Sequence, residues 1–255
     1  LIMNNSVLEF RDEKVRQALR YLINPEEIMN YSYFDLAERT DTPVYPNTWA
    51  YNTHIKKLDY SFEKAMKLLD EAGWVDTNND GVRDKYIDGK LRKLRLRFIV
   101  YEEAENNVRI ATANLIAEKL KLAGIQCNKE FSAEVLSFAD AQARLRAGSF
   151  DIALVAYNMD QVPDPGFMLM SRNTGNFSRY SSSKMDELFK TLRSSKTQEE
   201  YKRTLDKIQA LFWHDCPFIC LYYRRGAILT RKLYTKARDL REPFLFRGIV
   251  KDGEN

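Results

Sequence analysis

At 255 residues, of which 44% are hydrophobic, the chain can bury one good core, or one and a half, and has an ordinary globular composition. Its formal net charge of +4 is spread along the sequence rather than clustered, which gives no particular support to nucleic-acid binding. No run approaches the roughly 20 apolar residues that a membrane-spanning helix needs.

Two helices are predicted near the start of the chain. Apolar residues recur on one face of the first helix, at Val15, Ala18, Leu19, Leu22 and Ile23. Asn24 then caps a second helix, Pro25 takes its first position, and Glu27 completes a capping box. Residues 40–53 form a loop rich in aromatic residues. Such loops are often packed lids over a core, and they can also line a cleft.

Residues 60–90 join an amphipathic helix, a glycine–aromatic stop and an acidic loop. Ser61 caps the helix, whose inward face is predicted to hold Phe62, Ala65, Met66, Leu69 and Ala72. Gly73 supplies the left-handed residue that ends a helix, and Trp74 can fold back on the last turn as its apolar contact.

The acidic loop has the spacing of a calcium-binding loop through its ninth position. Its candidate ligands hold positions one, three, five, seven and nine: Asp76, Asn78, Asp80, Val82 (through its carbonyl oxygen) and Asp84. Position twelve is Ile87 rather than glutamate, so a complete EF-hand fails. A turn held by side-chain hydrogen bonds is favoured over a bound ion, and any calcium would be structural and weak.

From residue 94 onward, strands and helices alternate. Leu94, Leu96 and Phe98 alternate with charged residues in the first strand, whose charged face reads as a solvated sheet edge rather than a binding patch. The next elements are a helix ending at Gly124, a strand over 125–131, a helix that includes Val135, Phe138 and Leu145 and closes at Gly148, and a strand over 150–156. This pattern predicts a β-α-β-α-β unit with parallel or mixed strands.

Two more helices, marked by Met185 to Leu192 and by Tyr201 to Phe212, and a final strand over 217–223 complete the predicted elements. The three cysteines are Cys127, Cys216 and Cys220, an odd number that does not make a disulfide framework. Four residues along one strand would separate Cys216 from Cys220 by about 13 Å, too far to bridge. Buried free thiols are therefore favoured.

The strand over 150–156 ends in Tyr157, Asn158, Met159 and Asp160. Ligands of open α/β sheets bind at the carboxyl ends of the strands. A tyrosine, an amide and a carboxylate that arrive together from a buried strand form a candidate recognition point. The alternative is that Asp160 only caps a turn before the prolines that follow.

The order of motifs in residues 60–82 resembles the extracellular solute-binding proteins of the peptide and nickel ABC transporters, family 5. The matching segments are 60–69, 71–74 and 80–82. The resemblance continues in the helix pair over 10–30, at Gly124-Ile125, over 147–160, at Asp164-Pro165, and in the spacing of Asn176, Tyr180 and Asp186.

This resemblance implies an α/β fold, namely the second lobe of a type II periplasmic-binding-protein fold, with a mixed sheet flanked by helices. It assigns residues 1–222 to this C-terminal lobe and residues 223–255 to a segment that returns toward a missing first lobe. The chain is then expected to be a fragment of an exported protein, either periplasmic or lipid-anchored at the cell surface, whose signal segment lies outside the fragment.

The function implied is that of a monomeric binding protein, not an enzyme, for an ABC importer. It would capture an oligopeptide or similar small solute by hinge closure and deliver it to the permease and ATPase complex, without nucleic acid or a cofactor. In peptide-binding relatives, an aspartate at the position that corresponds to Asp160 pairs with the α-amino group of the ligand. Tyr157, Asn158, Asn176 and Tyr180 complete the candidate ligand-binding set.

Two departures from the family pattern affect this site. Tyr157 stands where tryptophan is more usual, and one extra residue separates Asp160 from the Asp164-Pro165 pair. Two other functions stay open: a secreted hydrolase with Asp160 and Asp164 as an acid/base pair, and an adhesion or signalling module. The cargo is also open among peptides, nickel chelates, haem and sugars.

Overall fold

The computed structural model describes residues 1–33, 37–104, 107–159, 163–224, 234–235 and 250–251. The chain divides into two compact units, Leu1–Arg224 and Arg225–Asn255. In the second unit the described residues form one short antiparallel pair, β11 (Tyr234–Thr235) with β12 (Val250–Lys251). The expected return of this segment toward another lobe stays a prediction.

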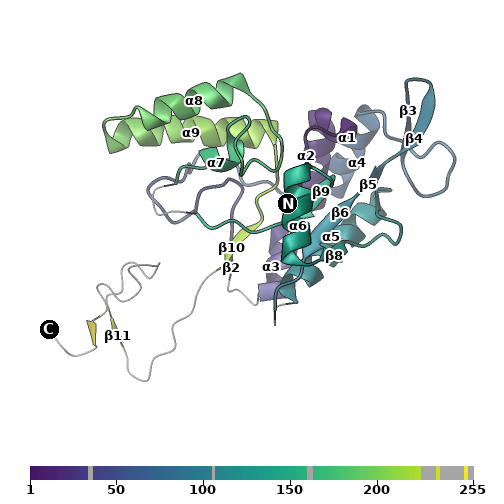
Figure 1. Cartoon of the computed structure of the whole chain (residues 1–255), viewed down its shortest axis with the longest axis horizontal. Coiled ribbons are helices and arrows are strands. Elements are labelled where there is room, and N and C mark those ends of the chain that lie inside the picture. Colours follow the sequence, from purple (N-terminus) through teal and green to yellow (C-terminus); the bar gives the residue numbers. More distant parts are fainter. Residues whose placement is uncertain (34–36, 105–106, 160–162, 225–233, 236–249, 252–255) are drawn as a thin grey trace. The chain divides into compact units, whose positions relative to one another are not determined.

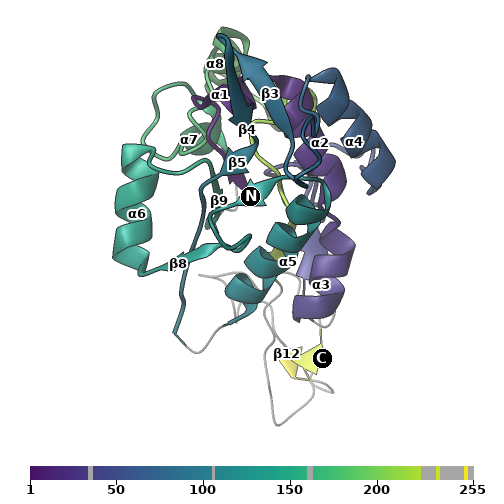
Figure 2. The same cartoon turned by 90° about the vertical axis from the view of Figure 1, so that its right-hand side faces the viewer.

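The first unit is built on a mixed four-stranded sheet in the order β1 (Ile2–Met3), β9 (Ile152–Leu154), β6 (Phe98–Tyr101) and β8 (Glu134–Leu136). Strand β6 is parallel to both β9 and β8, whereas β1 is antiparallel to β9. Helix α5 (Val108–Leu122) follows β6, and helix α6 (Phe138–Ala147) joins β8 to β9. The predicted β-α-β-α-β unit and the mixed sheet flanked by helices are therefore confirmed (Figure 2).

Alternate residues of these strands face two different hydrophobic cores, because successive side chains of a strand point to opposite faces. Phe98, Val100 and Ile152 belong to one core, whereas Ile99 and Ala153 belong to the other. All five are buried. The sheet thus separates the two cores and is covered on both faces.

The first core is covered by five helices, namely α5 together with α1 (Leu8–Arg11), α2 (Glu13–Leu22), α3 (Pro25–Tyr33) and α4 (Phe62–Glu71). The predicted apolar face of α2 is buried throughout: Val15, Ala18, Leu19, Leu22 and Ile23. The Asn24 side chain accepts hydrogen bonds from the backbone N–H groups of Glu26 and Glu27, which confirms the predicted cap of α3.

Helix α4 begins and ends as the sequence predicts. The Ser61 hydroxyl accepts a hydrogen bond from the Lys64 N–H at the start. At the end Gly73 has φ +82°, and the N–H of the buried Trp74 reaches back to the Leu69 carbonyl at 2.9 Å. Phe62 was predicted to face inward but is 37% exposed, because the buried stripe begins one turn later, at Ala65.

The second core lies under α7 (Gly166–Leu169), α8 (Ser183–Arg193) and α9 (Gln198–Asp215). Helices α8 and α9 lie side by side (Figure 1) and confirm the two predicted helices. Met185, Phe189, Leu192, Leu205, Ile208 and Phe212 are their buried positions among those predicted. None of the helices in the described ranges is both long and apolar enough to cross a membrane.

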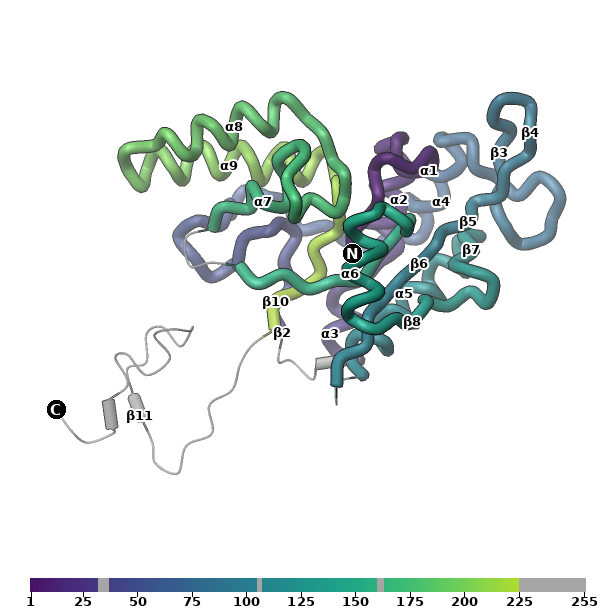
Figure 3. The backbone as a smooth tube through the Cα atoms, in the orientation of Figure 1, coloured from purple at the N-terminus to yellow at the C-terminus, as the bar shows by residue number. Residues whose placement is uncertain are grey.

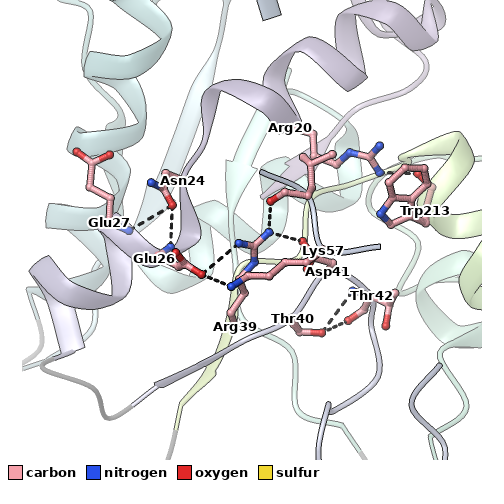
Figure 4. A network of polar contacts seen from close by, with 11 residues as sticks. Arg20, Asn24, Glu26, Glu27, Arg39, Thr40, Asp41, Thr42, Lys57 and Trp213 are labelled. Carbon is pink, nitrogen blue, oxygen red and sulfur yellow. Dashed lines mark hydrogen bonds and ion pairs between the residues drawn. The ribbon is translucent and has the colours of Figure 1, made fainter. Parts of the chain in front are cut away.

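The aromatic loop (residues 40–53) packs over this second core. The buried amide of Gln209 on α9 donates to the Ala50 carbonyl and accepts hydrogen bonds from the Thr42 hydroxyl and the Asn52 N–H. Arg39, just before the loop, pairs with Asp41 and with Glu26 of α3 (Figure 4). The loop is therefore a packed lid tied to both α3 and α9.

Four short strands extend the structure beyond the sheet: β3 (Asp84–Ile87), β4 (Lys90–Lys93), β5 (Arg95–Leu96) and β7 (Gln126–Cys127). The antiparallel hairpin of β3 and β4 projects away from the helices (Figure 3), while β5 is parallel to β7. The strand predicted over 125–131 is thus wrong in extent. Asn128 has φ +49°, which ends β7, and the next strand along the chain is β8.

The start of α6 and the last predicted strand also differ from expectation. Val135 lies in β8 rather than in a helix, because Ser137 caps α6 by accepting a hydrogen bond from the Asp140 N–H. The strand expected over 217–223 is confined to β10 (Tyr222–Arg224), which pairs with β2 (Ala37–Arg39). Cys216 ends α9 with φ +47°, and this left-handed residue separates the helix from any strand.

The three thiols are free, as predicted. Cys127 and Cys216 are buried and Cys220 is half-buried. Cys216 and Cys220 do not share a strand, so the distance expected from strand geometry does not apply to them. Burial raises the pKa of the Cys127 thiol to about 12, which keeps it protonated and unreactive at neutral pH.

Alanine substitutions at two glycines with left-handed backbones distinguish the cost of backbone strain from the cost of a packing clash. Gly89 has φ +72° and open space where a Cβ would stand. Gly124 has φ +76°, but its Cβ would lie 3.0 Å from Cγ of Arg83, whose Nε is held at 2.9 Å by the Ala123 carbonyl. We expect Gly89→Ala to lower the free energy of unfolding by about 1 kcal/mol. Gly124→Ala should lower it by roughly 1–3 kcal/mol more, as measured by urea denaturation. Equal losses in the two variants would contradict the packing argument.

Candidate functional site

Strands β6, β8 and β9 end at one edge of the sheet, because all three run in the same direction. Their last residues are Tyr101, Leu136 and Leu154. This carboxyl edge is where open α/β sheets bind ligands. The segment that follows β9 carries Tyr157 and Asn158, two of the predicted recognition residues.

Tyr157 lies in a cluster of three aromatic rings at this edge. Its ring centroid is 5.6 Å from that of Phe167, in an edge-on arrangement, and 6.2 Å from that of Phe177, in a stacked one. Its hydroxyl donates a hydrogen bond to the Gly175 carbonyl at 3.2 Å. Burial raises the pKa of Tyr157 well above its ordinary value, so the hydroxyl stays a donor.

Gly175 is the residue that lets this cluster close. A Cβ at this position would lie 2.8 Å from the Phe167 carbonyl oxygen and 2.9 Å from the Phe167 ring. Asn158, the next residue after Tyr157, is exposed, and its contact with a ligand stays a prediction. Asp160, the predicted partner of a ligand amino group, lies outside the described residues.

Asn176 and Tyr180 are buried within the loop between α7 and α8. The Asn176 amide donates to the carbonyls of Met170 at 3.0 Å and Tyr180 at 2.8 Å, and its oxygen accepts from the Ser178 hydroxyl at 2.8 Å. The Tyr180 hydroxyl donates to the Asp215 carboxylate at the end of α9. These contacts give both residues a role in shaping the loop, and direct contact of either with a ligand stays a prediction.

Asp164 is committed to local contacts. One carboxylate oxygen accepts a hydrogen bond from the Gly166 N–H at 2.8 Å, and the other pairs with Nε of Arg193 at 3.0 Å. These bonds fix the start of α7 against α8. They suit a structural acceptor, and the use of Asp164 as a catalytic acid or base stays untested.

Sequence reasoning missed two groups of side chains near this edge. Trp49 of the aromatic loop packs on Tyr201, with ring centroids 6.0 Å apart, and the Tyr201 hydroxyl donates to the Pro163 carbonyl at 3.2 Å. At the end of β6 the Arg109 guanidinium lies 3.8 Å from the centre of the Tyr101 ring and 3.1 Å from the Glu103 carboxylate. An aromatic residue followed by acidic ones at a strand end was the available signal for this second group.

The acidic loop before the hairpin is held by its own side chains. The Asp76 carboxylate accepts hydrogen bonds from the N–H groups of Asp80 at 3.1 Å and Gly81 at 2.8 Å. Asp80 accepts a hydrogen bond from the Val82 N–H at 3.1 Å and pairs with Lys93. Asn78 donates to Asp80 as well, at 3.0 Å.

Asp84 is fully buried, and its two carboxylate oxygens accept hydrogen bonds from the N–H and the hydroxyl of Thr77. The described residues contain no group of three or more acidic, cysteine or histidine side chains arranged to hold a metal. The contacts match a turn stapled by side chains, and a weak calcium ion at this loop stays a prediction.

Two isosteric substitutions test whether the Asn176 side chain stabilises the fold and the Asn158 side chain does not. In Asn176→Asp an oxygen would replace the amide nitrogen that faces two carbonyl groups, so we expect a loss of about 2–3 kcal/mol in the free energy of unfolding. Asn158→Asp, at an exposed position, should change it by less than about 0.5 kcal/mol. Chemical denaturation of both variants measures the difference, and a neutral Asn176→Asp would refute the structural role.

Calcium addition distinguishes the two interpretations of the acidic loop. The stapled turn predicts that Asp76→Ala lowers the free energy of unfolding by about 1 kcal/mol through two lost acceptors. It also predicts a melting temperature that moves by less than about 1 °C between EDTA and millimolar calcium. A rise with calcium, but not with magnesium, that disappears in Asp76→Ala would establish an ion instead.

Comparison with known proteins places the chain among binding proteins. The model of the bacterial extracellular solute-binding proteins, family 5 Middle, matches residues 1–179. The oligopeptide-binding protein AppA of Bacillus subtilis strain 168 is 28% identical over 221 residues, covering 84% of this chain and 39% of AppA. The heme-binding protein A of Haemophilus influenzae is 25% identical over 231 residues, covering 89% of this chain and 39% of that protein.

The solved structure of Bacillus subtilis AppA in complex with a nonapeptide superposes with a TM-score of 0.77 at 26% identity, over 88% of this chain and 44% of AppA. The chain therefore shares its fold with part of a peptide-binding protein. It spans about two fifths of the length of the curated relatives it matches.

Proposed function

Because the chain belongs to the bacterial extracellular solute-binding proteins of family 5, we propose that it forms one lobe of the binding protein of an ABC importer. Its cargo is an oligopeptide or a small solute of similar size, which it binds without chemical change. The named relatives bind oligopeptide and heme, and the match to the oligopeptide-binding protein extends to the fold.

The observation that carries this proposal is the aromatic cluster at the carboxyl edge of the sheet. Tyr157 is anchored by Phe167, Phe177 and the Gly175 carbonyl, so the chain leaves β9 along a fixed path. Asn158 follows as an exposed polar side chain on this rigid base. A preorganised edge of this kind binds a ligand without a large loss of side-chain entropy.

Capture by such a protein proceeds through closure of two lobes. A ligand that contacts both lobes shifts the equilibrium toward the closed state by its extra affinity for that state. The closed protein then presents its cargo to a permease and ATPase complex in the membrane. In this proposal the protein acts as an exported monomer, periplasmic or anchored at the cell surface.

Within the site, Asp160 is proposed to pair with the α-amino group of a peptide. The proposal rests on its position three residues after Tyr157 at the end of β9. A charge-assisted hydrogen bond to a cation is about twice as strong as a neutral one, and more so where the closed lobes exclude water.

Thermal shift measurements on the protein encoded by the complete gene test this proposal. We expect free-amine peptides of two to five residues to raise the melting temperature, since a ligand that binds only the native state stabilises it. The shift should disappear for N-acetylated peptides and in Asp160→Ala. Asp164→Asn serves as the matched control, because Asp164 is committed to Gly166 and Arg193.

Nickel-histidine, haem and simple sugars are included in the same panel. An equal shift with acetylated peptides would refute the amino-group role of Asp160 while leaving a peptide-binding protein. A shift with a non-peptide solute alone would refute the peptide cargo. Hydrolysis of any peptide in the panel would refute the binding function itself.

A further inference from the structure

Two segments of the chain carry a surplus of positive charge. Residues 84–97 hold six cationic and two acidic residues, and residues 224–255 hold nine cationic and four acidic residues. The interpretation of the charge as spread along the sequence is therefore wrong. The first segment comprises the β3–β4 hairpin and β5, on the far side of the sheet from its carboxyl edge.

The hairpin exposes an apolar pair beside these cations. Tyr86 stands directly opposite Leu91 in the register of β3 and β4, and the two are 69% and 42% exposed. The neighbouring pair sets Lys85 opposite Arg92, and like charges in that position destabilise a hairpin. Lys85 is held within the chain, because its Nζ donates to the Ala72 carbonyl at 2.7 Å, whereas the exposed Tyr86–Leu91 pair has no comparable cover.

The charged face of β5 borders an open groove. Leu94, Leu96 and Phe98 are buried, so alternation places Arg95 and Arg97 on the outer face. The groove has a volume of about 730 Å³, and the residues that line it include Arg95, Arg97, Asn128, Lys129, Glu130 and Glu134. It opens where β7 has ended and β8 has not begun.

Asn128 makes the walls of this groove rigid. Its side chain accepts a hydrogen bond from the Phe98 N–H at 3.2 Å and donates to the Phe98 carbonyl at 2.8 Å. It also donates to the Ser132 carbonyl at 2.7 Å. The amide thus takes the place of a strand neighbour beside Phe98 and ties the loop 128–133 to the start of β6.

Several cations at this face are available to a partner. Within the described ranges, the side chains of Lys90, Arg92 and Lys129 make no ion pair or hydrogen bond in this structure. Arg95 uses Nε to contact Gln126 at 2.8 Å and keeps its remaining N–H groups. Arg97 forms an ion pair with Asp151, so it forms part of the groove wall and is not assigned to binding the partner.

We propose that this groove, together with the exposed Tyr86–Leu91 pair, is a docking surface for an acidic, extended segment of a partner protein. Arg95 and Lys129 would bind its carboxylates, and an apolar side chain of the segment would cover Tyr86 and Leu91. Charge complementarity requires a partner segment of negative charge. Tyrosine and arginine are among the residue types enriched in protein interfaces.

The exposed Tyr86–Leu91 pair favours a polypeptide over other polyanions, because an acidic segment can also supply an apolar side chain, whereas polyphosphate cannot. Of the two acidic residues that line the groove, Glu134 is neutralised by its ion pair with Arg144. A bilayer surface would meet the projecting hairpin but would not enter a recess. Because the surface lies away from the carboxyl edge, this docking does not depend on the proposed solute site.

The test uses fluorescence anisotropy of the 255-residue chain with a labelled peptide of four Glu-Glu-Leu repeats, acetylated and amidated so that it carries no terminal amino group. We expect binding that weakens about tenfold between about 50 and 300 mM salt. Arg95→Glu with Lys129→Glu should weaken binding at low salt by at least about tenfold and create affinity for the corresponding Lys-Lys-Leu peptide. Tyr86→Ser with Leu91→Ser should weaken binding several-fold without changing the salt dependence.

Lys184→Glu with Lys207→Glu is the matched control, since it changes the net charge equally at exposed sites on α8 and α9. This control should bind the acidic peptide within about twofold of the original chain. A neutral pair, Arg95→Gln with Lys129→Gln, keeps the test valid if the charge reversal unfolds the chain. Equal loss in the control pair, no binding up to about 1 mM, or equally tight binding of phosphatidylglycerol vesicles or polyphosphate through the same residues would overturn the proposal.

Discussion

Burial of the central strands on both faces is the constraint on which the first unit depends. Strand β6 has only four residues, yet Phe98, Ile99 and Val100 are each within 1% of full burial. Short parallel strands of this kind need helices on both sides, since neither face can be left to water. The two hydrophobic cores, the helices that cover them and the common direction of the strand ends all follow from this requirement.

The beginning of the chain completes that sheet and holds the candidate site to it. Strand β1 pairs with β9, and the Asn4 side chain donates to the Phe150 carbonyl just before β9 at 3.0 Å. The Asn5 side chain donates to the carbonyls of Ser178 and Pro217, both at 2.9 Å. The loop that carries Asn176 and Tyr180 is therefore fixed by residues more than 170 positions away, a linkage that no local pattern reveals.

Features set by neighbouring residues could be predicted from the sequence, and features set by distant contacts could not. The caps at Asn24 and Ser61 and the stop at Gly73-Trp74 depend on three or four adjacent residues, and each was predicted correctly. Strand limits were predicted poorly. A side-chain amide ends β7 at Asn128, and Cys216 adopts a left-handed backbone that its residue type does not suggest.

In the candidate site, too, some features could be predicted from the sequence and others could not. The position of Tyr157 at a strand end could be predicted, but its packing on Phe167 and Phe177 depends on a loop whose path is set by tertiary contacts. Hydrophobic periodicity also could not show that the charged face of β5 borders a groove. The two ends of the parallel strands differ accordingly. The carboxyl edge holds aromatic rings and amides in fixed positions, while residues 84–97, at the opposite end, hold six cationic and two acidic residues. The solute site and the docking surface that we propose therefore lie at opposite ends of the parallel strands.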